Sequence, residues 1–493
     1  MTLPLADILA ILPELLVVGA ACLILIFDPL TPPSRKDWLA WLSIGTLVLC
    51  ALVTASQMHG RTTAFSEIVI LDPYAGFWKL LLYGVTALTI LLSLVYLKIE
   101  HIHLGEYYGF ILLSLSGMMI MVSAADLLTI YLGMELMSLS LYILAGFKRF
   151  EARSLEASAK YFVLGAFSSG ILLYGISLLF GAAGGTRLSL IAQAATTRGF
   201  QDPSLLLGMI LLIVGFGFKI AAVPFHMWTP DVYEGSPTSV TAYMAVASKA
   251  ASFGAFVRVF LEGLGGLTAD WDALVLTLCV ATLLLGNVVA IVQTNIKRML
   301  AYSSIAHAGY ALIGLVVAGR ATAEASVRTF GIASVMLYLA VYAFMTLGAF
   351  AVVAMLRKGS VEGDEIDDYA GLAKRQPVAA LLMMVFLVSL AGIPPTAGFI
   401  GKFYLFMAAV DAGMAWLAVV GLLFAAVSGY YYLRVVMVMY MRDPDPAAGM
   451  LPRLATSPAM TFVLVCAVAG VVLFGLYPDP LVSLATHSAL VLK

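Results

Sequence analysis

The chain alternates long apolar runs with short polar connections, and this pattern predicts a membrane protein built from helices. Most runs are close to the roughly 20 apolar residues that a transmembrane helix needs. A transmembrane β-barrel would instead show strands of about ten residues with alternating hydrophobicity. We therefore expect an all-α polytopic protein with about 14 transmembrane helices in a single membrane domain, residues 1–493. The predicted spans lie near residues 5–27, 38–58, 74–97, 106–123, 126–147, 156–181, 203–228, 237–261, 272–293, 299–318, 325–356, 377–410, 415–440 and 459–477.

The composition supports the same class of protein. Of the 493 residues, 62% are hydrophobic and only 11% are charged, which excludes a soluble globular chain, a nucleic-acid binder and a disordered protein. The net charge of −1 gives no electrostatic preference for acidic or basic partners. The four cysteines are far apart and lie in apolar runs, so we interpret them as buried hydrophobic residues rather than cluster or zinc ligands.

Basic residues in the connections predict the orientation. The odd-numbered connections carry 14 Lys or Arg residues, against six in the even-numbered connections and the C-terminus together. By the positive-inside rule the odd connections, including the acidic 359–376 connection, are cytoplasmic and both termini are periplasmic. The first basic residues, Arg35 and Lys36, follow the first apolar run, so we expect a retained span rather than a cleaved leader.

Four ionisable residues lie too deep in their spans to reach the lipid headgroups. They are Glu135, Lys219, Lys249 and Lys402. Such a residue at the bilayer centre costs about 2.5–3.5 kcal/mol even on lenient scales, so we predict functional roles for all four.

Other charged residues lie nearer to the span ends. For Lys79, Arg258 and Arg434 we expect side chains that reach the headgroup region along the helix surface. Lys160 follows Glu156 by one turn, which fits an ordinary surface pair as well as a functional role.

Two spans are expected to be broken at membrane depth. Lys219 is followed by Pro224, and Lys402 is preceded by Pro394 and Pro395, with glycines beside both lysines. Matched Gly/Pro-interrupted spans are typical of transporters with internal repeats, and spans seven and twelve are an odd number apart, so the repeats must be inverted. We expect repeats of spans 4–8 and 9–13, with the chain divided into 1–104, 105–262, 263–442 and 443–493.

Buried lysines near a carboxylate are suited to proton transfer. Desolvation disfavours the charged amine and a nearby carboxylate restores it, so a changing Glu–Lys separation could capture and release protons. His226, in the broken seventh span, and His307, among hydroxyl side chains, are candidate relay residues or satisfied structural histidines. No nucleotide-binding or nucleophile motif is present, and we expect no cofactor in this chain.

Several long blocks resemble a known family. They include IYLGMELMSLSLYILAGF, GFGFKIAAVPFHMWTPDVYEGSPTSVTAYMAVASKAASF, NIKRMLAYSSIAHAGYALIG and LAGIPPTAGFIGKF. From about Asp72 to Asp443 the chain resembles the antiporter-like membrane subunits of the proton-pumping NADH:quinone oxidoreductase, respiratory complex I. DVYEGSPT and the lysine at the end of the last block favour the subunit N branch over subunits M and L.

The resemblance implies roles for individual residues. Glu135 would pair with Lys219, Lys249 would be the central connecting lysine, and His307 would lead to Lys402, the terminal lysine of the outward half-channel. Lys160 would match a less central family lysine on the sixth span. NAD, FMN, iron–sulfur clusters and quinone would belong to partner subunits. The chain would lie in the bacterial inner membrane, beside subunit M and small hydrophobic subunits.

Two other classes of function remain open from the sequence. The chain could belong to a multisubunit cation/proton antiporter or to a ferredoxin-driven relative, neither of which uses NADH. A haem-bearing electron carrier is disfavoured, because His101 and His103 are two residues apart and do not share a helical face. Co-purification would discriminate a complex I subunit, which is expected with flavin and iron–sulfur subunits, from an antiporter subunit, which is expected with small hydrophobic partners only.

Overall fold

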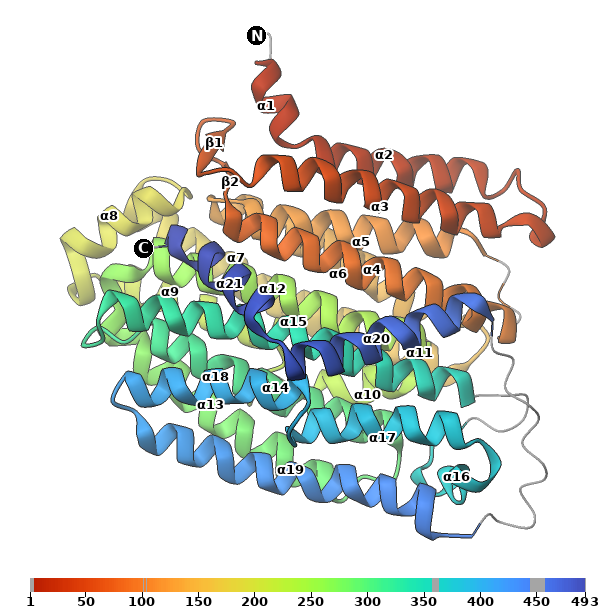
Figure 1. The fold of residues 1–493 in the computed structure, drawn as a ribbon. Coiled ribbons are helices and arrows are strands. Elements are labelled where there is room, and N and C mark those ends of the chain that lie inside the picture. The colour runs from red at the N-terminus through yellow and green to blue at the C-terminus, as the bar shows by residue number, and fades with distance from the viewer. Residues whose placement is uncertain (1–3, 101, 103, 357–362, 444–456, 493) are drawn as a thin grey trace.

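The computed structural model describes residues 4–100, 102, 104–356, 363–443 and 457–492. In this part of the chain, long helices lie side by side in a bundle, seen side-on in Figure 1. Eleven helices among the described residues are long and apolar enough to cross a membrane. Three shorter apolar helices, Leu12–Phe27, Pro203–Lys219 and Pro377–Ala391, accompany them. The predicted all-α membrane fold is confirmed.

Every predicted span coincides with one helix or with consecutive helices. The first eight correspond to α1 (Leu5–Ala10) with α2 (Leu12–Phe27), α3 (Asp37–Gln57), α4 (Pro73–Ile99), α5 (Glu106–Ser123), α6 (Leu127–Ala145), α7 (Ala152–Ala183), α9 (Pro203–Lys219) with α10 (Trp228–Gly235), and α11 (Thr238–Tyr243) with α12 (Lys249–Arg258). The others correspond to α13 (Thr268–Ile291), α14 (Ile296–Ala318), α15 (Ala325–Leu356), α17 (Pro377–Ala391) with α18 (Ala397–Asp411), α19 (Ala415–Met441) and α20 (Pro458–Leu476).

Three short α-helices and one hairpin of two strands lie outside the predicted spans. Two helices, α8 (Leu188–Arg198) and α21 (Asp479–Ala489), are too short and too polar to cross a membrane, and α16 (Leu372–Arg375) is a single turn. Strands β1 (Thr62–Ala64) and β2 (Val69–Leu71) form an antiparallel hairpin in which Thr62 is opposite Leu71. Hydropathy does not detect such elements, because none of them buries a long apolar run.

The two unusually long apolar runs behave differently. Residues 325–356 form one unbroken helix, α15, whereas residues 377–410 divide into α17 and α18. Only the second run contains proline within it, at Pro394 and Pro395. A proline removes a backbone donor and clashes with the preceding turn, which accounts for the break.

The connections gather on two opposite faces of the bundle. On the odd face, odd-numbered connections are joined by ion pairs such as Lys98–Asp37 and Lys148–Glu100. On the even face, even-numbered connections are joined in the same way, as by Arg61–Glu262, Arg187–Glu67 and Arg320–Asp272. Both described ends of the chain contact the connection between α3 and α4 on the even face, because Gln57 donates to the Leu9 carbonyl and Arg61 to the Val491 carbonyl.

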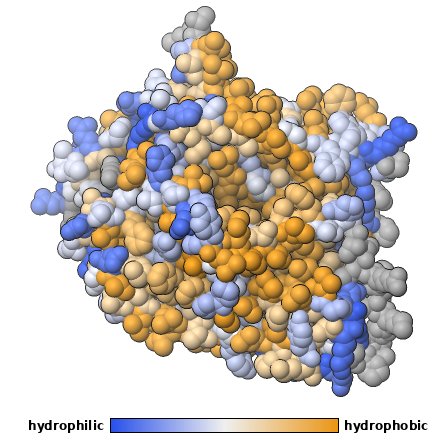
Figure 2. All heavy atoms as spheres, in the orientation of Figure 1, coloured by the Kyte–Doolittle hydropathy of each residue, from blue (hydrophilic) through white to orange (hydrophobic). Residues whose placement is uncertain are grey.

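The surface has the distribution of polarity expected of a membrane protein. On the face shown in Figure 2, hydrophobic residues cover the middle, and hydrophilic residues gather towards the two edges where the helices end. Three spans lie almost entirely inside the protein: 238–263, α14 and α15 are each 94% buried over their most apolar part. Lys249 and Arg258, which lie on residues 238–263, are accordingly surrounded by protein rather than lipid.

Candidate functional site: a row of buried lysines

The seventh span breaks directly after Lys219, as the sequence predicts. This lysine is the last residue of α9, and Ala221 follows it with a φ of +60°. Two backbone groups freed by the break find side-chain partners: Val223 N donates to Thr282 Oγ1 at 2.9 Å, and Phe218 O accepts from the Trp228 indole at 3.0 Å. The break is therefore held by polar contacts inside the protein.

Lys219 contacts the helix of Glu135 without contacting Glu135 itself. Its Nζ donates to Ser138 Oγ at 2.7 Å, and Ser138 lies one turn after Glu135 on α6. The Glu135 carboxylate accepts a short hydrogen bond from Ser169 on α7. Among the described residues Glu135 and Lys219 form no ion pair within 4.0 Å, and each side chain is hydrogen-bonded to a different serine.

The twelfth span also breaks beside its lysine. Lys402 lies on α18, after the break, and its Nζ donates to the carbonyls of Leu390 and Ala391 at the end of α17, both at 2.9 Å. The amine also lies 4.7 Å from the centre of the Tyr310 ring. A lysine that caps the broken end of one half-helix from the other half can couple its charge to the geometry of the break.

Helix α14 connects the central lysine to the terminal one. Lys249 donates to both the hydroxyl and the carbonyl oxygen of Ser304 on α14. His307 follows Ser304 by three residues, and Tyr310, which lies under the Lys402 amine, follows by three more. Residues three apart share a helical face, so one side of α14 joins Lys249 to Lys402.

The histidine on this face is held by two tyrosines. His307 Nδ1 lies 2.5 Å from the Tyr338 hydroxyl, and Nε2 lies 3.2 Å from the Tyr432 hydroxyl. Tyr342, one turn after Tyr338 on α15, donates to Ser304 Oγ at 2.8 Å. His307 is 2% exposed, and both ring nitrogens are engaged, which is the arrangement a buried proton relay needs.

Lys249 lies at an irregular point of its own span. Two π-helical turns, Met244–Ser248 and Val259–Gly263, flank α12, whose first residue is this lysine. Single π turns inside α-helices are rare and are found frequently at functional sites. The central lysine is thus positioned by a deviation from regular helix that hydropathy does not reveal.

The two secondary candidates, His226 and Lys160, lie in different surroundings. His226 is half-buried in the broken segment, and its Nδ1 has no hydrogen-bond partner within the part of the chain that the structure describes. Lys160 lies on the odd face, where its Nζ is 2.8 Å from Glu156 and 2.7 Å from Asp231. The surface pair expected for Lys160 is present, but it is part of a larger cluster.

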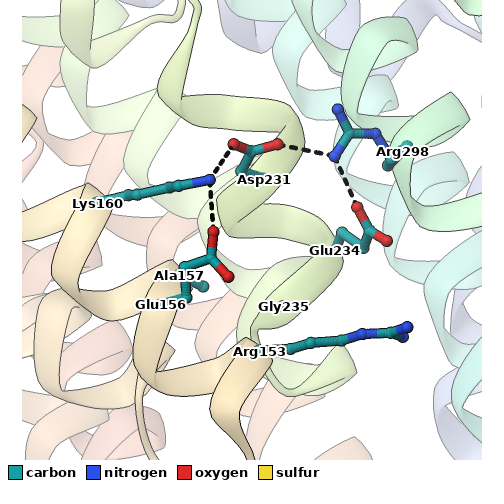
Figure 3. Close-up of a pocket in the computed structure, with 8 residues that line it drawn as sticks. All are labelled: Arg153, Glu156, Ala157, Lys160, Asp231, Glu234, Gly235 and Arg298. Atoms are coloured by element: carbon teal, nitrogen blue, oxygen red, sulfur yellow. Dashed lines mark hydrogen bonds and ion pairs between the residues drawn. The ribbon is translucent and has the colours of Figure 1, made fainter.

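This cluster surrounds a cavity of about 190 Å³ shown in Figure 3. Arg298 donates to both Asp231 and Glu234 at 2.7 Å. Burial would raise the pKa of Asp231, but hydrogen bonds from Lys160 and Arg298 outweigh this effect and hold the pKa below its usual range. The cavity therefore presents fixed, opposite charges to the odd face.

The prediction that the Lys79 and Arg258 side chains reach the lipid headgroups is wrong. Lys79 is 2% exposed and pairs with Glu14 at 2.6 Å, and Arg258 is fully buried with two hydrogen bonds of 2.9 Å to Asp72. Both partners are far away in sequence, and Asp72 also caps the N-terminus of α4. Arg434 instead donates to the carbonyls at the end of α13, including Ile291 at 2.8 Å.

Comparison with known proteins places the chain among membrane subunits. A family model described as NADH:quinone oxidoreductase/Mrp antiporter, TM, matches residues 124–428. A protein of Rhizobium meliloti named NADH-quinone oxidoreductase subunit N 2 is 48% identical over 98% of this chain and 97% of its own length. NADH-quinone oxidoreductase subunit N of Trichlorobacter lovleyi is 44% identical over 97% of this chain and 96% of its own length.

Solved structures agree with these sequence matches. A chain of respiratory complex I from Thermus thermophilus superposes with a TM-score of 0.80 at 30% identity, covering 96% of this chain and 99% of that one. A chain of the Mrp complex from Dietzia superposes with a TM-score of 0.82 at 19% identity, covering 97% of each chain. The second likeness shows a shared fold alone.

Proposed function

The chain belongs to the NADH:quinone oxidoreductase/Mrp antiporter family, within the subunit N branch of respiratory complex I, and from that membership we propose that it carries protons through its buried Glu, Lys and His residues. Electron transfer from NADH to quinone takes place in other subunits and supplies the energy. This chain contributes a path along which protons and charge move across the membrane.

The observation that carries the proposal is the polar face of α14. It joins Lys249, through Ser304 and His307, to Tyr310 and Lys402 in the interior of the bundle. Each lysine amine is hydrogen-bonded to oxygen atoms, and these oxygen atoms can accept a hydrogen bond from the ammonium form or from the neutral amine. A lysine that alternates between these forms can take a proton from one neighbour and give it to the next.

The first half of the chain provides the other part of the path. Glu135, Ser138 and Lys219 form a second polar group between α6 and α9, and movement of the broken seventh span would bring the carboxylate and the amine together or separate them. We assign secondary relay roles near this group to two residues. Lys160 lies at the charged cavity, and His226 lies in the break of the seventh span. We assign proton uptake to the odd face and release to the even face.

The proposed orientation follows from the basic connections. The odd face is cytoplasmic, and the even face, with both termini, is periplasmic. We further propose inverted repeats of spans 4–8 and 9–13. The two 32-residue helices, α7 and α15, support this arrangement, because each is the third helix of its repeat.

The partners and cofactors follow from the family. NAD, FMN, iron–sulfur clusters and quinone belong to other subunits, and this chain lies beside subunit M and small hydrophobic subunits. Within the described residues no group of three His, Cys, Asp or Glu side chains is placed to hold a metal ion. A metal or flavin that co-purifies with the chain in stoichiometric amounts would contradict this assignment.

The proposal is tested by replacing the buried lysines with arginine. A guanidinium keeps the positive charge but does not release its proton at accessible pH. In inverted vesicles that contain the assembled complex, Lys402→Arg and Lys219→Arg should each lower NADH-driven proton uptake at least tenfold. Lys374→Arg is the matched control, because Lys374 is a 62% exposed surface lysine paired with Asp443. Native gels verify assembly.

Two results would contradict the proposal. Normal proton uptake by an assembled Lys219→Arg or Lys402→Arg complex would exclude lysine deprotonation. Purification of the chain with small hydrophobic subunits only, together with cation-driven proton exchange that needs no NADH, would instead identify an antiporter complex.

A further inference from the structure

A buried ion pair joins α2 to α4, outside the row of lysines. Lys79 Nζ lies 2.6 Å from Glu14 Oε1, and the two side chains are 2% and 9% exposed. Apart from this ion pair, neither carboxylate oxygen of Glu14 has a hydrogen-bond partner among the described residues. The neighbouring titratable groups are Cys50 on α3 and Tyr83 on α4, and Tyr83 is hydrogen-bonded to Thr54 at 3.1 Å.

Stability alone does not account for these charges. Removing a carboxylate and an ammonium from water is costly, and their attraction repays the cost only when further hydrogen bonds satisfy the remaining oxygen atoms. Glu14 lacks such hydrogen bonds in the described structure. Apolar side chains of similar volume are often as stable as a buried pair or more so. A role that needs the charges is the better explanation.

A small cavity lies between Lys79 and the even face. It has a volume of about 10 Å³ and is lined by Lys79 together with Thr54, Gln57 and Asp72, at the ends of α3 and α4 that face the even connections. A volume of this size holds about one water molecule when several polar groups line it, as they do here. Lys79 therefore has a route for proton exchange that does not use the main row.

The same cavity is linked to the span of the central lysine. Asp72, which lines it, precedes Lys79 by two helical turns on one face of α4. Asp72 is bound by both oxygen atoms to Arg258, the last residue of α12, whose first residue is Lys249. A displacement of this span when Lys249 changes its charge is thus transmitted to the face of α4 that carries Lys79.

We propose that Glu14 and Lys79 form a second proton-handling pair, which opens during turnover and exchanges protons with the even face through this cavity. The step is a proton transfer only. When the Lys79 amine moves away, it opens the way between the cavity and Glu14, and a proton that enters from the even face through the cavity water protonates the Glu14 carboxylate. Glu14 returns that proton to the even face by the same route when the pair closes. The inference rests on the proposed pumping function and extends it to the first three spans.

The first experiment measures protonation of Glu14 with dicyclohexylcarbodiimide, which modifies protonated carboxyl groups in apolar surroundings. Wild-type complex is treated in inverted vesicles with and without NADH, and the modified peptides are measured by mass spectrometry. We expect NADH to raise modification of Glu14 several-fold, and Lys79→Met to raise it without NADH. Asp72 is the internal control, because its arginine partner does not release a proton. Equal modification of Glu14 with and without NADH would overturn the inference.

The second experiment separates a proton-handling role from a structural one. The double variant Glu14→Leu with Lys79→Met replaces the pair with apolar side chains, so a structural role predicts full proton uptake per NADH oxidised. We expect an assembled complex with lowered uptake per NADH, and full uptake would overturn the inference. Failure of the underlying pumping function is recognised separately, by normal uptake in the Lys402→Arg complex.

Discussion

At the scale of single residues, Gly392 shows how closely the twelfth span is fitted to its lysine. Its φ is +86°, and a Cβ at this position would lie 2.9 Å from Lys402 Cδ. Only glycine adopts this backbone conformation without strain, and only glycine leaves room for the lysine stem. The residue therefore determines both the break and the path of the side chain that caps it.

Gly392→Ala should accordingly impair pumping more than its backbone strain explains. The strain costs about 1–2 kcal/mol at any left-handed position, and here the added methyl group also displaces Lys402. Gly413→Ala is the control, because its φ is +73° and its Cβ would contact nothing within 4 Å. We expect both complexes to assemble, with NADH-driven proton uptake clearly reduced in Gly392→Ala alone. Equal uptake in the two variants would show that the contact with Lys402 is unimportant.

Asp231, in the charged cavity of the odd face, predicts a pH dependence. Its pKa is lower in the folded protein than in the unfolded chain, so its contribution to stability is complete above the usual carboxyl pKa and is lost as the pH falls through the lowered value. Asp231→Asn should therefore lower the melting temperature of the complex at neutral pH. The difference from wild type should shrink as the pH is lowered, as measured by thermal unfolding across an acid series. A difference that grows towards acid pH would contradict the assignment.

The sequence singles out deeply placed charged residues more readily than it predicts their partners. Depth within an apolar run singles out Glu135, Lys219, Lys249 and Lys402, because an isolated charge there is costly. The partners come from other helices, and no local pattern reveals them. For this reason the expectation that Lys79 reaches the headgroups is wrong, since this lysine pairs with a residue 65 positions earlier.

At the scale of elements, α14 is the helix on which the proposed path depends. The spacing of Ser304, His307 and Tyr310 predicts a shared face from sequence alone. That this face lies between Lys249 and Lys402 depends on the packing of α15 and α18 against α14 and on the reach of the Lys249 side chain from α12, which the sequence does not specify.

His307→Gln tests this helix. Glutamine can replace the hydrogen bonds to the two tyrosines, but it does not accept a proton at neutral pH. We expect an assembled complex whose NADH-driven proton uptake falls at least tenfold, since one acid–base group typically contributes about 10²–10⁴-fold. His487→Gln on α21 is the control, because that histidine is exposed. Unchanged uptake in His307→Gln would restrict the histidine to a structural role.

The sequence predicts that the seventh and twelfth spans are broken, but it does not predict the local geometry of either break. Proline and glycine mark both positions in the sequence. The left-handed conformation at Ala221 and the capping of α17 by Lys402 were not predictable, because each depends on contacts formed across the break.

At the scale of the whole molecule, the two faces give a test of orientation. Phe150, on the odd face, is 93% exposed, and Thr62 is exposed in the hairpin on the even face. In intact cells, a membrane-impermeant maleimide should modify Thr62→Cys and leave Phe150→Cys unmodified, each in a background without the native cysteines. Inverted vesicles should give the opposite result. Modification of Phe150→Cys alone in intact cells would reverse the orientation and with it the direction of proton release.

The distribution of apolar runs was sufficient to predict the architecture, since each run coincides with helices in the structure. Sequence could not predict which spans lie at the centre. α3 and α14 both read as apolar runs, yet α3 is peripheral and α14 is enclosed by its neighbours. Hydropathy measures the transfer of a segment into an apolar medium and does not distinguish lipid from protein.

The two π-helical turns around α12 have a consequence for the phase of this span. Each residue of an α-helix advances the chain by 100°, and a π turn accommodates one residue beyond the regular repeat. Deleting one residue within Met244–Ser248 would regularise the helix and leave Lys249 facing Ser304, because the π turn absorbs the extra residue without rotating the rest of the span. Two relatives can therefore differ in length by one residue at this turn and keep the lysine on the same wall of the span, whereas the same difference in a regular part of the helix would rotate the lysine by about 100°. Elsewhere on the protein, in an exposed loop, the same difference would alter nothing in the interior.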